Sequence, residues 1–311
     1  MIKPVTQKPR PTVAVIGAGR LGQAFAIALQ SSGYPVVALV ARRRQKAEKA
    51  AALLEETCGR GPGKSWPKFA FGANQLGDLP ATDLVLITTP DDAIQDTAQR
   101  LSSLWNGRKR STVLHTSGAL SSEALAPLAE KGFQTGSIHP LVSVSDSLSG
   151  AAALHGAFFC VEGTGKAKRL TEAIVHDLGG HSFTIRPEHK ALYHAAAVMT
   201  APHLTALVDL AVEMLSACGL SNSKAQKVFI PLLESTVNNL KTSNPQQALT
   251  GTFARGDIAT VRRHLEALSG RELAEALAVY KVLGLHSLRL AEKNGLDAKL
   301  LNDIRKLLRS A

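Results

Sequence analysis

The chain carries the stretch Val13-Ala14-Val15-Ile16-Gly17-Ala18-Gly19-Arg20-Leu21-Gly22, which decides the fold. Residues 13–16 form an apolar run typical of a buried parallel strand. Apolar side chains then recur at helical spacing from Leu21 to Leu29, and Gly33 ends the predicted helix. A strand, a glycine turn and a helix in this order bring backbone N–H groups and the positive end of a helix to one point. Such a point suits a pyrophosphate group.

The three glycines of this turn have separate expected roles. Gly17 allows the tight turn, Gly19 lets phosphates approach the backbone, and Gly22 lets the helix pack closely on the strand. Arg20 and Leu21 lie between them and are expected to contact the same ligand. An ordinary strand-to-helix turn is the alternative interpretation, because the GxGxxG spacing is by itself a weak signal.

The end of the second predicted strand, residues 36–40, indicates which dinucleotide would bind. A site for NAD places a carboxylate there to hold the ribose 2′-hydroxyl. This chain instead has Arg42, Arg43 and Arg44, and Glu48 is its first acidic residue. A guanidinium pairs with a 2′-phosphate that a carboxylate would repel, so the pattern predicts NADP(H). A solvated helix start is the alternative for any one of the three arginines.

Length and composition limit the classes of protein to which the chain can belong. With 311 residues it is long enough for two domains of roughly 150 residues. The net charge of +11 suits an anionic cofactor and an acidic small substrate. Nucleic acid is not expected as a partner, because the basic residues are scattered and the few aromatics show no stacking pattern. The three cysteines and ten histidines show no disulfide framework and no metal-site spacing.

Alternating patterns predict an α/β fold in the first part of the chain and helices alone in the second. Strands are expected at residues 13–16, 36–40, 69–71, 83–88, 113–116, 134–138, 158–161 and 182–185. This alternation is typical of a Rossmann-type, doubly wound and mainly parallel sheet. We therefore expect a nucleotide-binding domain at residues 1–186 and an all-helical substrate and dimerisation domain at residues 187–311.

The longest apolar stretch, residues 195–215, contains Pro202, His203, Asp209 and Glu213. These polar residues favour a buried helix over a membrane span. The chain also begins without an apolar segment typical of a signal peptide. We expect a cytoplasmic protein that forms a homodimer and does not contact a membrane.

Several motifs resemble those of an uncharacterised family that pairs a Rossmann-like domain with a helical domain of unknown function. They lie at residues 16–22, 115–119, 137–141, 190–194, 248–251 and 254–257. More distantly, the layout is similar to that of the β-hydroxyacid dehydrogenases, ketopantoate reductase, pyrroline-5-carboxylate reductase and prephenate dehydrogenase. The resemblance implies a two-domain NAD(P) oxidoreductase. Some members of the family look like an alternative ketopantoate reductase, so ketopantoate is the first substrate to test.

Residues that follow the predicted strands are expected to line the nicotinamide site, since ligands of open parallel sheets bind at the carboxyl ends of the strands. His139 follows such a strand, in a setting similar to that of a prephenate dehydrogenase histidine that contacts the reacting hydroxyl. It is a candidate proton donor, although a lone histidine there is also a common structural hydrogen-bonder. The other residues of this group are Thr88, Thr89, Pro90, Thr116, Ser117 and Gly118.

Lys190 and His194 lie four residues apart and therefore share one face of a predicted helix. The β-hydroxyacid dehydrogenases carry Lys-x-x-x-Asn on the corresponding helix, and the resemblance implies that Lys190 is a general acid. His194 replaces the asparagine and is a second candidate. An exposed, non-catalytic lysine is the alternative for Lys190.

Arg255 is the candidate anchor for a substrate carboxylate, and Asp257 is expected to cap the following helix. Together these features predict an NADPH-dependent oxidoreductase that reduces a small carbonyl compound bearing a carboxylate. The helical domain is expected to close the site. The alternatives are an oxidation like that of prephenate dehydrogenase and a non-catalytic NADPH-binding sensor.

Overall fold

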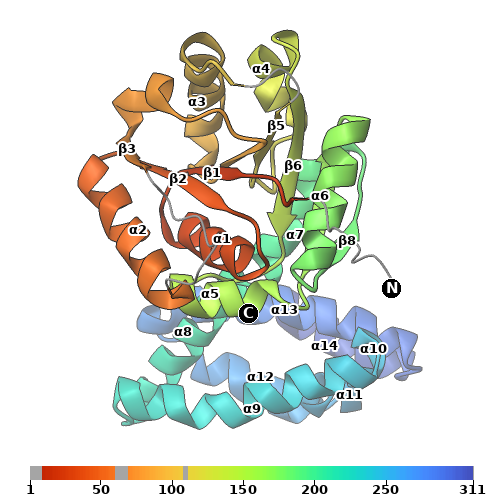
Figure 1. Cartoon of the computed structure of the whole chain (residues 1–311). Helices are drawn as coiled ribbons and strands as arrows, with labels where there is room; N and C mark the ends of the chain where they lie inside the picture. The colour runs from red at the N-terminus through yellow and green to blue at the C-terminus, as the bar shows by residue number, and fades with distance from the viewer. Residues whose placement is uncertain (1–8, 60–68, 108–110, 311) are drawn as a thin grey trace, which may run out of the picture. The chain divides into compact units, whose positions relative to one another are not determined.

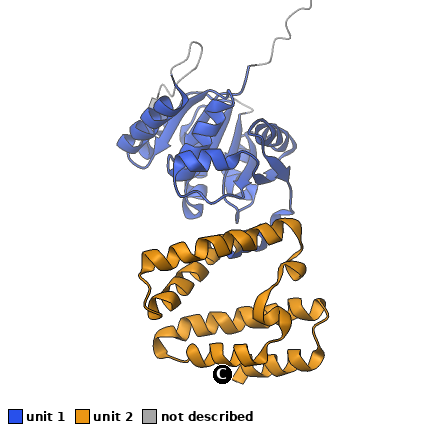
Figure 2. Ribbon diagram, turned by 90° about the horizontal axis from the view of Figure 1, so that it is seen from below, with its two compact units in different colours: residues 1–199 blue, residues 200–311 orange. Residues whose placement is uncertain are grey.

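The computed structural model describes residues 9–59, 69–107 and 111–310, and the chain divides into two compact units (Figure 2). The first unit extends to Met199 and the second begins at Thr200. The division lies beyond residue 186, where the sequence pattern changes. The reason is that the helix α7 (Lys190–Thr200) contacts the sheet through its first residues, so that it belongs with the first unit.

The first unit contains an eight-stranded sheet in the order β3-β2-β1-β4-β5-β6-β7-β8. The strands are β1 (Val13–Ile16), β2 (Val36–Ala41), β3 (Phe69–Gly72), β4 (Leu84–Ile87), β5 (Thr112–His115), β6 (Gln134–Pro140), β7 (Phe158–Gly163) and β8 (His181–Phe183). Neighbouring strands run parallel except β6 and β7, which are antiparallel. The predicted mainly parallel, Rossmann-type sheet is therefore confirmed.

Helices cover both faces of this sheet (Figure 1). The helices of the first unit are α1 (Arg20–Ser31), α2 (Arg44–Cys58), η1 (Ala73–Asp78), α3 (Asp91–Leu104), η2 (Ser122–Leu125), α4 (Ala126–Glu130), α5 (Ser147–Leu154), α6 (Gly165–Asp177), η3 (Pro187–His189) and α7. Side chains alternate along β1: Val13 and Val15 pack with α1, α2 and α6, whereas Ala14 and Ile16 pack with α3 and α4. The central strands β1, β2 and β4 are apolar throughout because both of their faces are buried.

Two short elements, η1 and α5, were not predicted from the sequence. The sequence of α5, Ser-Leu-Ser-Gly-Ala-Ala-Ala-Leu, has no 3.6-residue apolar period that would indicate a helix. Asp146 caps its first turn by accepting hydrogen bonds from the backbone N–H groups of Leu148 and Ser149. A Cβ added at Gly150 would lie 3.2 Å from the Cβ of Ala24, so small residues let α5 pack tightly on α1.

The second unit consists of helices in the residues that the structure describes, as predicted. They are α8 (Pro202–Ala217), α9 (Asn222–Thr242), α10 (Pro245–Ala248), α11 (Gly251–Arg255), α12 (Ile258–Ala267), η4 (Arg271–Leu273), α13 (Ala274–Lys293) and α14 (Ala298–Ser310). The core of this unit lies between α12, α13 and α14, where Val261, Leu288 and Ile304 are fully buried.

The helix α8 is far less buried than the sequence suggested. The predicted buried helix at residues 195–215 is wrong: the stretch breaks at Ala201 into α7 and α8, and Val212 is the one residue of α8 classed as buried. A helical stretch at 187–217 is long and apolar enough, by length and composition, to cross a membrane. Only 6% of its most apolar window is buried. The polar residues within this apolar stretch were therefore not a sign that the helix is buried.

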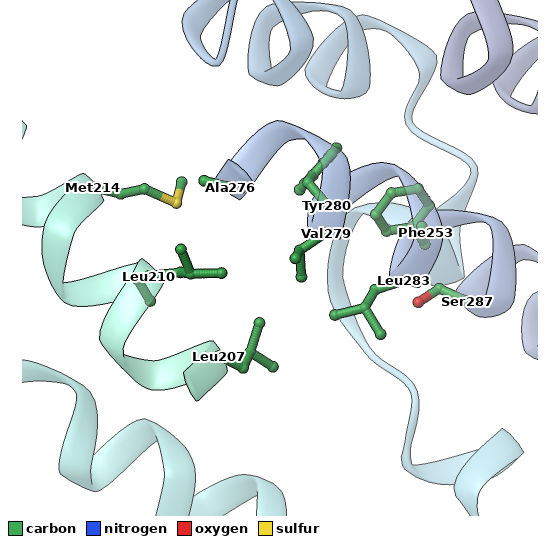
Figure 3. Close-up of a pocket in the computed structure, with 11 residues that line it drawn as sticks. Leu207, Leu210, Met214, Phe253, Ala276, Val279, Tyr280, Leu283 and Ser287 are labelled. Atoms are coloured by element: carbon green, nitrogen blue, oxygen red, sulfur yellow. The ribbon is translucent and has the colours of Figure 1, made fainter. Parts of the chain in front are cut away.

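A small apolar pocket of about 150 Å³ lies between α8 and α13 in the second unit. Leu207, Leu210 and Met214 of α8 face Val279 and Leu283 of α13 across it (Figure 3). These two helices therefore leave apolar side chains facing an open space within the unit.

Candidate functional site

The glycine turn follows β1 in a conformation that needs its glycines. Gly17 has a φ of +109°, and a Cβ there would lie 2.7 Å from the carbonyl carbon of Thr88. A Cβ at Gly22 would lie 2.2 Å from the carbonyl oxygen of Gly17. Thr88 closes the arrangement, because its hydroxyl donates to the Gly17 carbonyl oxygen at 2.7 Å. Two of the three glycines are thus required by the packing of the turn itself.

The helix α1 presents unbonded N–H groups to the turn. The first bond within the helix runs from the Gln23 N–H to the Gly19 carbonyl oxygen, so the amides of residues 20–22 have no partner in the helix. No acidic residue occupies the first turn. A Cβ at Gly19 would meet nothing closer than 4.0 Å, which leaves the approach to these amides open. The helix end can therefore receive an anionic group.

A cavity of about 840 Å³ opens over this turn. The glycine turn, the end of β2, the start of α2, η1 and part of α3 line it. Its basic lining residues are Arg20, Arg42, Lys46, Lys49 and Arg100, against a single acid, Asp96. This excess of positive charge suits a ligand with several phosphate groups.

The three arginines at residues 42–44 do not share one environment. Arg42 lines the cavity, whereas Arg43 and Arg44 are not among the described residues that line it. Arg44 forms an exposed ion pair with Glu48, with 3.0 Å between its Nε and the Glu48 Oε1. Lys46 and Lys49, one turn further along, reach the cavity instead. Sequence interpretation missed them because they resemble the solvated face of an ordinary helix.

Thr88, Thr89 and Pro90, which follow β4, all line the same cavity. The hydroxyl of Thr89 is buried and has no hydrogen-bond partner among the described residues. A buried polar atom without a partner is costly unless a ligand or water satisfies it. Thr89 is therefore placed to bond a ligand of the cavity.

The residues that follow β5 are held by a histidine that the sequence interpretation did not select. His115 is fully buried, and its Nε2 donates to the Ser121 carbonyl oxygen at 2.9 Å. Its Nδ1 accepts from the Ser117 N–H at 3.2 Å, so the ring is neutral. Burial lowers the pKa of His115 to about 4. The sequence signal that could have identified His115 was its position in the motif at residues 115–119.

Ser117 connects this loop to the helix α3. Its hydroxyl donates to the Asp91 carboxylate at 2.7 Å and accepts from the N–H groups of Ala119 and Leu120. Ser117 and its neighbour Thr116 are both buried. These residues therefore hold the backbone of the loop in place, whereas a direct contact of either with a cofactor stays a prediction.

His139 and His194 come together beside Gly118. Their ring centroids lie 5.7 Å apart at 82°. A Cβ added at Gly118 would lie 2.8 Å from the His139 Nε2 and 2.6 Å from the His194 Cδ2. Burial lowers the pKa of His139 to about 4, with smaller contributions in the same direction from His194 and Lys190. His139 is therefore a neutral hydrogen-bonding group near pH 7.

Lys190 is buried rather than exposed, which rules out its alternative interpretation as a surface lysine. It is 1% accessible, and its Nζ donates to the Ser137 hydroxyl at 2.9 Å and to the Ser117 carbonyl oxygen at 3.3 Å. Glu162 accepts from the Ser137 hydroxyl at 3.4 Å, so a carboxylate lies one hydrogen bond away from the ammonium group. Burial lowers the pKa of Lys190, and Cys160 and Glu162 oppose that shift. Through these hydrogen bonds Lys190 holds the loop after β5 and the strand β6 in place.

The structure places His139, His194, Lys190, Ser117 and Gly118 in one cluster at the carboxyl ends of β5 and β6. Arg255 lies in the other unit, where it is exposed at the end of α11. Asp257 caps α12 as expected, since it accepts from the Thr260 N–H at 3.0 Å. No group of three metal-ligating side chains occurs among the residues that the structure describes.

Two family models match the chain, a Rossmann-like domain at residues 72–140 and a domain of unknown function, DUF2520, at residues 157–287. The chain pairs a Rossmann-like domain with a DUF2520 domain. This is the family that the sequence motifs indicated. No curated protein matches the sequence.

Solved structures of similar fold include a candidate NADP oxidoreductase from Bacteroides fragilis. It is 21% identical, with a TM-score of 0.70, and the match covers 90% of this chain and 99% of that one. A Thermotoga maritima protein is 22% identical with a TM-score of 0.65, over 91% and 99% of the two chains. The reductive aminase of Aspergillus terreus, bound to NADPH and ethyl levulinate, is 14% identical with a TM-score of 0.54, over 96% and 93%. The chain therefore has the same fold as these three proteins.

Proposed function

We propose that the protein is an NADPH-dependent oxidoreductase that reduces a small carbonyl compound bearing a carboxylate. One observation carries the proposal: a basic cavity over a glycine turn and a histidine pair lie at the same edge of one sheet. Arg42 and Lys46 mark one end of the arrangement, beside β2, and His139 marks the other, at the end of β6. An extended dinucleotide laid across β1 and β4 would join the two ends.

The residues of the cavity fit NADP(H) at each of its parts. The amides at the start of α1 would bind the pyrophosphate, and Arg42 with Lys46 would bind the 2′-phosphate. Thr89 supplies a buried hydroxyl that lacks a partner, suited to the ribose or the nicotinamide amide. When bound, NADPH supplies the hydride that reduces the carbonyl carbon. NADPH bound to the similarly folded reductive aminase also favours this cofactor.

His139 is the residue best placed to act on the carbonyl oxygen. A neutral imidazole can donate a hydrogen bond to an oxygen that gains negative charge as hydride arrives. Lys190 is less suited to direct contact, because its ammonium group is buried against Ser117 and Ser137. His194 lies beside His139 and would shape the same substrate position.

A substrate panel tests the proposed function directly. NADPH consumption is followed by its absorbance with a series of 2-oxo acids, ketopantoate first. At least one oxo acid should be reduced, and His139→Gln should lower its turnover by roughly a hundredfold while NADPH still binds. Tight NADPH binding without turnover on any carbonyl compound of the panel would favour the sensor instead.

We also propose that a second copy of the chain covers the apolar faces of α8 and α9. Leu204, Val228, Leu232 and Leu240 are all more than 40% exposed, and clustered exposed apolar side chains mark an interaction surface. A bilayer is a poorer occupant, because the first half of the apolar stretch at 187–217 holds Lys190 and Tyr193 against the sheet. A dimer buries such faces by symmetry.

The mass of the protein in solution tests this partner. Light scattering after gel filtration, without detergent, should give twice the chain mass of 32.9 kDa. Leu232→Glu, on an exposed face, should reduce the mass to that of one chain, whereas Lys224→Glu on the same helix should not. A monomeric wild-type protein that floats with lipid vesicles would show that a membrane is the occupant.

A further inference from the structure

Tyr193 of α7 makes a short contact with His139 of β6. The Tyr193 hydroxyl oxygen lies 2.6 Å from the His139 Nδ1. The two rings are nearly perpendicular, with centroids 5.5 Å apart at 89°. On its other side Tyr193 packs against Phe183 of β8, 5.8 Å away at 71°. Tyr193 is thus held between Phe183 of β8 on one side and His139 of β6 on the other, with its hydroxyl toward the His139 Nδ1.

The hydrogen of this bond belongs to Tyr193. A phenol O–H is a good donor, and the bare nitrogen of a neutral imidazole is a better acceptor than a phenol oxygen. No other acceptor for this hydroxyl hydrogen occurs among the described residues. Burial raises the pKa of Tyr193, so the hydroxyl keeps its hydrogen, and burial lowers the pKa of His139 to about 4, so the ring stays neutral.

We propose that Tyr193 is a positioning residue that fixes His139 as the tautomer with its hydrogen on Nε2. Because Nδ1 accepts from Tyr193, the single hydrogen of the neutral ring must sit on Nε2. That nitrogen lies beside Gly118, the residue that follows the carboxyl end of β5. The inference rests on the proposed function, in which the Nε2–H group donates to the carbonyl oxygen of the substrate.

The fixed tautomer matters for the reaction because only a ring with hydrogen on Nε2 can donate on that side. A ring free to exchange tautomers would present a bare nitrogen to the carbonyl oxygen for part of the time, and two acceptors repel one another. Tyr193 therefore contributes to turnover without touching the substrate. His115 shows the same device in the same unit, with its tautomer set by the Ser117 N–H and the Ser121 carbonyl.

Nitrogen NMR of the protein labelled with ¹⁵N-histidine reports the tautomer without any substrate. His139 is assigned by the signals lost in His139→Gln. In the wild-type protein at pH 7, Nε2 should carry the hydrogen and Nδ1 should be bare. Tyr193→Phe removes the donor, so the signals should move toward a mixture of tautomers. With an oxo acid that the panel has identified, turnover should fall about tenfold, the loss of one hydrogen bond of about 1.4 kcal/mol, and NADPH affinity should change less than twofold.

A second tyrosine–histidine pair provides a matched control. In the other unit the Tyr280 hydroxyl lies 2.9 Å from the His264 Nδ1, with ring centroids 5.7 Å apart at 85°. Tyr280→Phe should alter the His264 signals and leave both the His139 signals and turnover unchanged. A hydrogen on the His139 Nδ1 in the wild-type protein, or unaltered His139 signals in Tyr193→Phe, would overturn the inference. Absent turnover in the wild-type protein would overturn the proposed function instead and leave the tautomer assignment standing.

Discussion

His139 and His194 meet edge to face, with ring centroids 5.7 Å apart, although one lies on a strand and the other on a helix. Gly118 makes this meeting possible, because the backbone of the β5 loop passes where a side chain would strike both rings. The contact between the two histidines therefore requires a residue without a side chain at position 118 of the loop.

Replacement of Gly118 by alanine should separate the two rings. The added Cβ would lie within 2.8 Å of both, closer than packed side chains tolerate. We expect turnover to fall at least tenfold while NADPH affinity changes less than about threefold. Steady-state kinetics and calorimetry measure the two quantities. Gly165→Ala is the control, since a Cβ there would make only an ordinary contact of 3.7 Å with Arg169; equal losses in both variants would contradict the account.

Lys190 should contribute to stability through its buried hydrogen bonds. Lys190→Met keeps the length of the side chain but leaves the Ser117 carbonyl and the nearby Glu162 without the ammonium group. The free energy of unfolding in urea should fall by about 2–4 kcal/mol. Lys168→Met removes an exposed lysine whose Nζ lies 3.9 Å from Glu172, and should cost less than about 1 kcal/mol. An unchanged free energy of unfolding in Lys190→Met would show that the buried ammonium group does not support the strand ends.

The buried histidines should make stability depend on pH in a defined window. The folded-state pKa of His115 is about 4, below its ordinary value of 6.5, because burial disfavours the charged ring. As the pH falls below 6.5, His115 therefore takes up a proton in the unfolded chain. In the folded chain its ring stays unprotonated until about pH 4. Stability is full above pH 6.5 and falls as the pH drops to 4, with a slope of order 1 kcal/mol per pH unit.

Urea unfolding at pH 7, 6 and 5 measures this slope. His115→Gln, which retains a donor toward the Ser121 carbonyl, should reduce it, and the part that remains is expected from His139, whose pKa is also lowered to about 4 by burial. His176→Gln, at a side chain that is 90% exposed, is the control for the substitution itself. If His115→Gln and the wild-type protein lose stability equally between pH 7 and pH 5, the buried neutral ring is not the cause.

The sequence alone predicts that Arg255 holds the substrate carboxylate. Arg255→Ala should raise the KM for the oxo acid at least tenfold, because a forked ion pair is lost, and leave the dissociation constant of NADPH unchanged. Arg289→Ala removes another exposed arginine of the same unit and should leave both values unchanged. An unaltered KM in Arg255→Ala would end its role as the anchor.

The centre of the sheet was readable from the sequence because β1, β2 and β4 are short apolar runs followed by glycine or polar residues, as at Gly17 and Thr88. The environment of single side chains was harder to read. Lys190 has the sequence context of an exposed helical lysine, and only the fold shows that it points under the strand ends. Lys46 and Lys49 face a cavity only because α2 turns that side toward the glycine loop. Helix α8 is apolar in sequence, yet its own unit leaves it exposed.

The preference between NADPH and NADH tests the central claim most directly. Calorimetric titration of the wild-type protein should show NADPH binding at least tenfold more tightly, a difference of about 1.4 kcal/mol. Arg42→Ala should remove most of this preference, because Arg42 lines the cavity, whereas Arg43→Ala should retain it, because Arg43 does not. Equal affinities of the unmutated protein for the two cofactors would contradict the account.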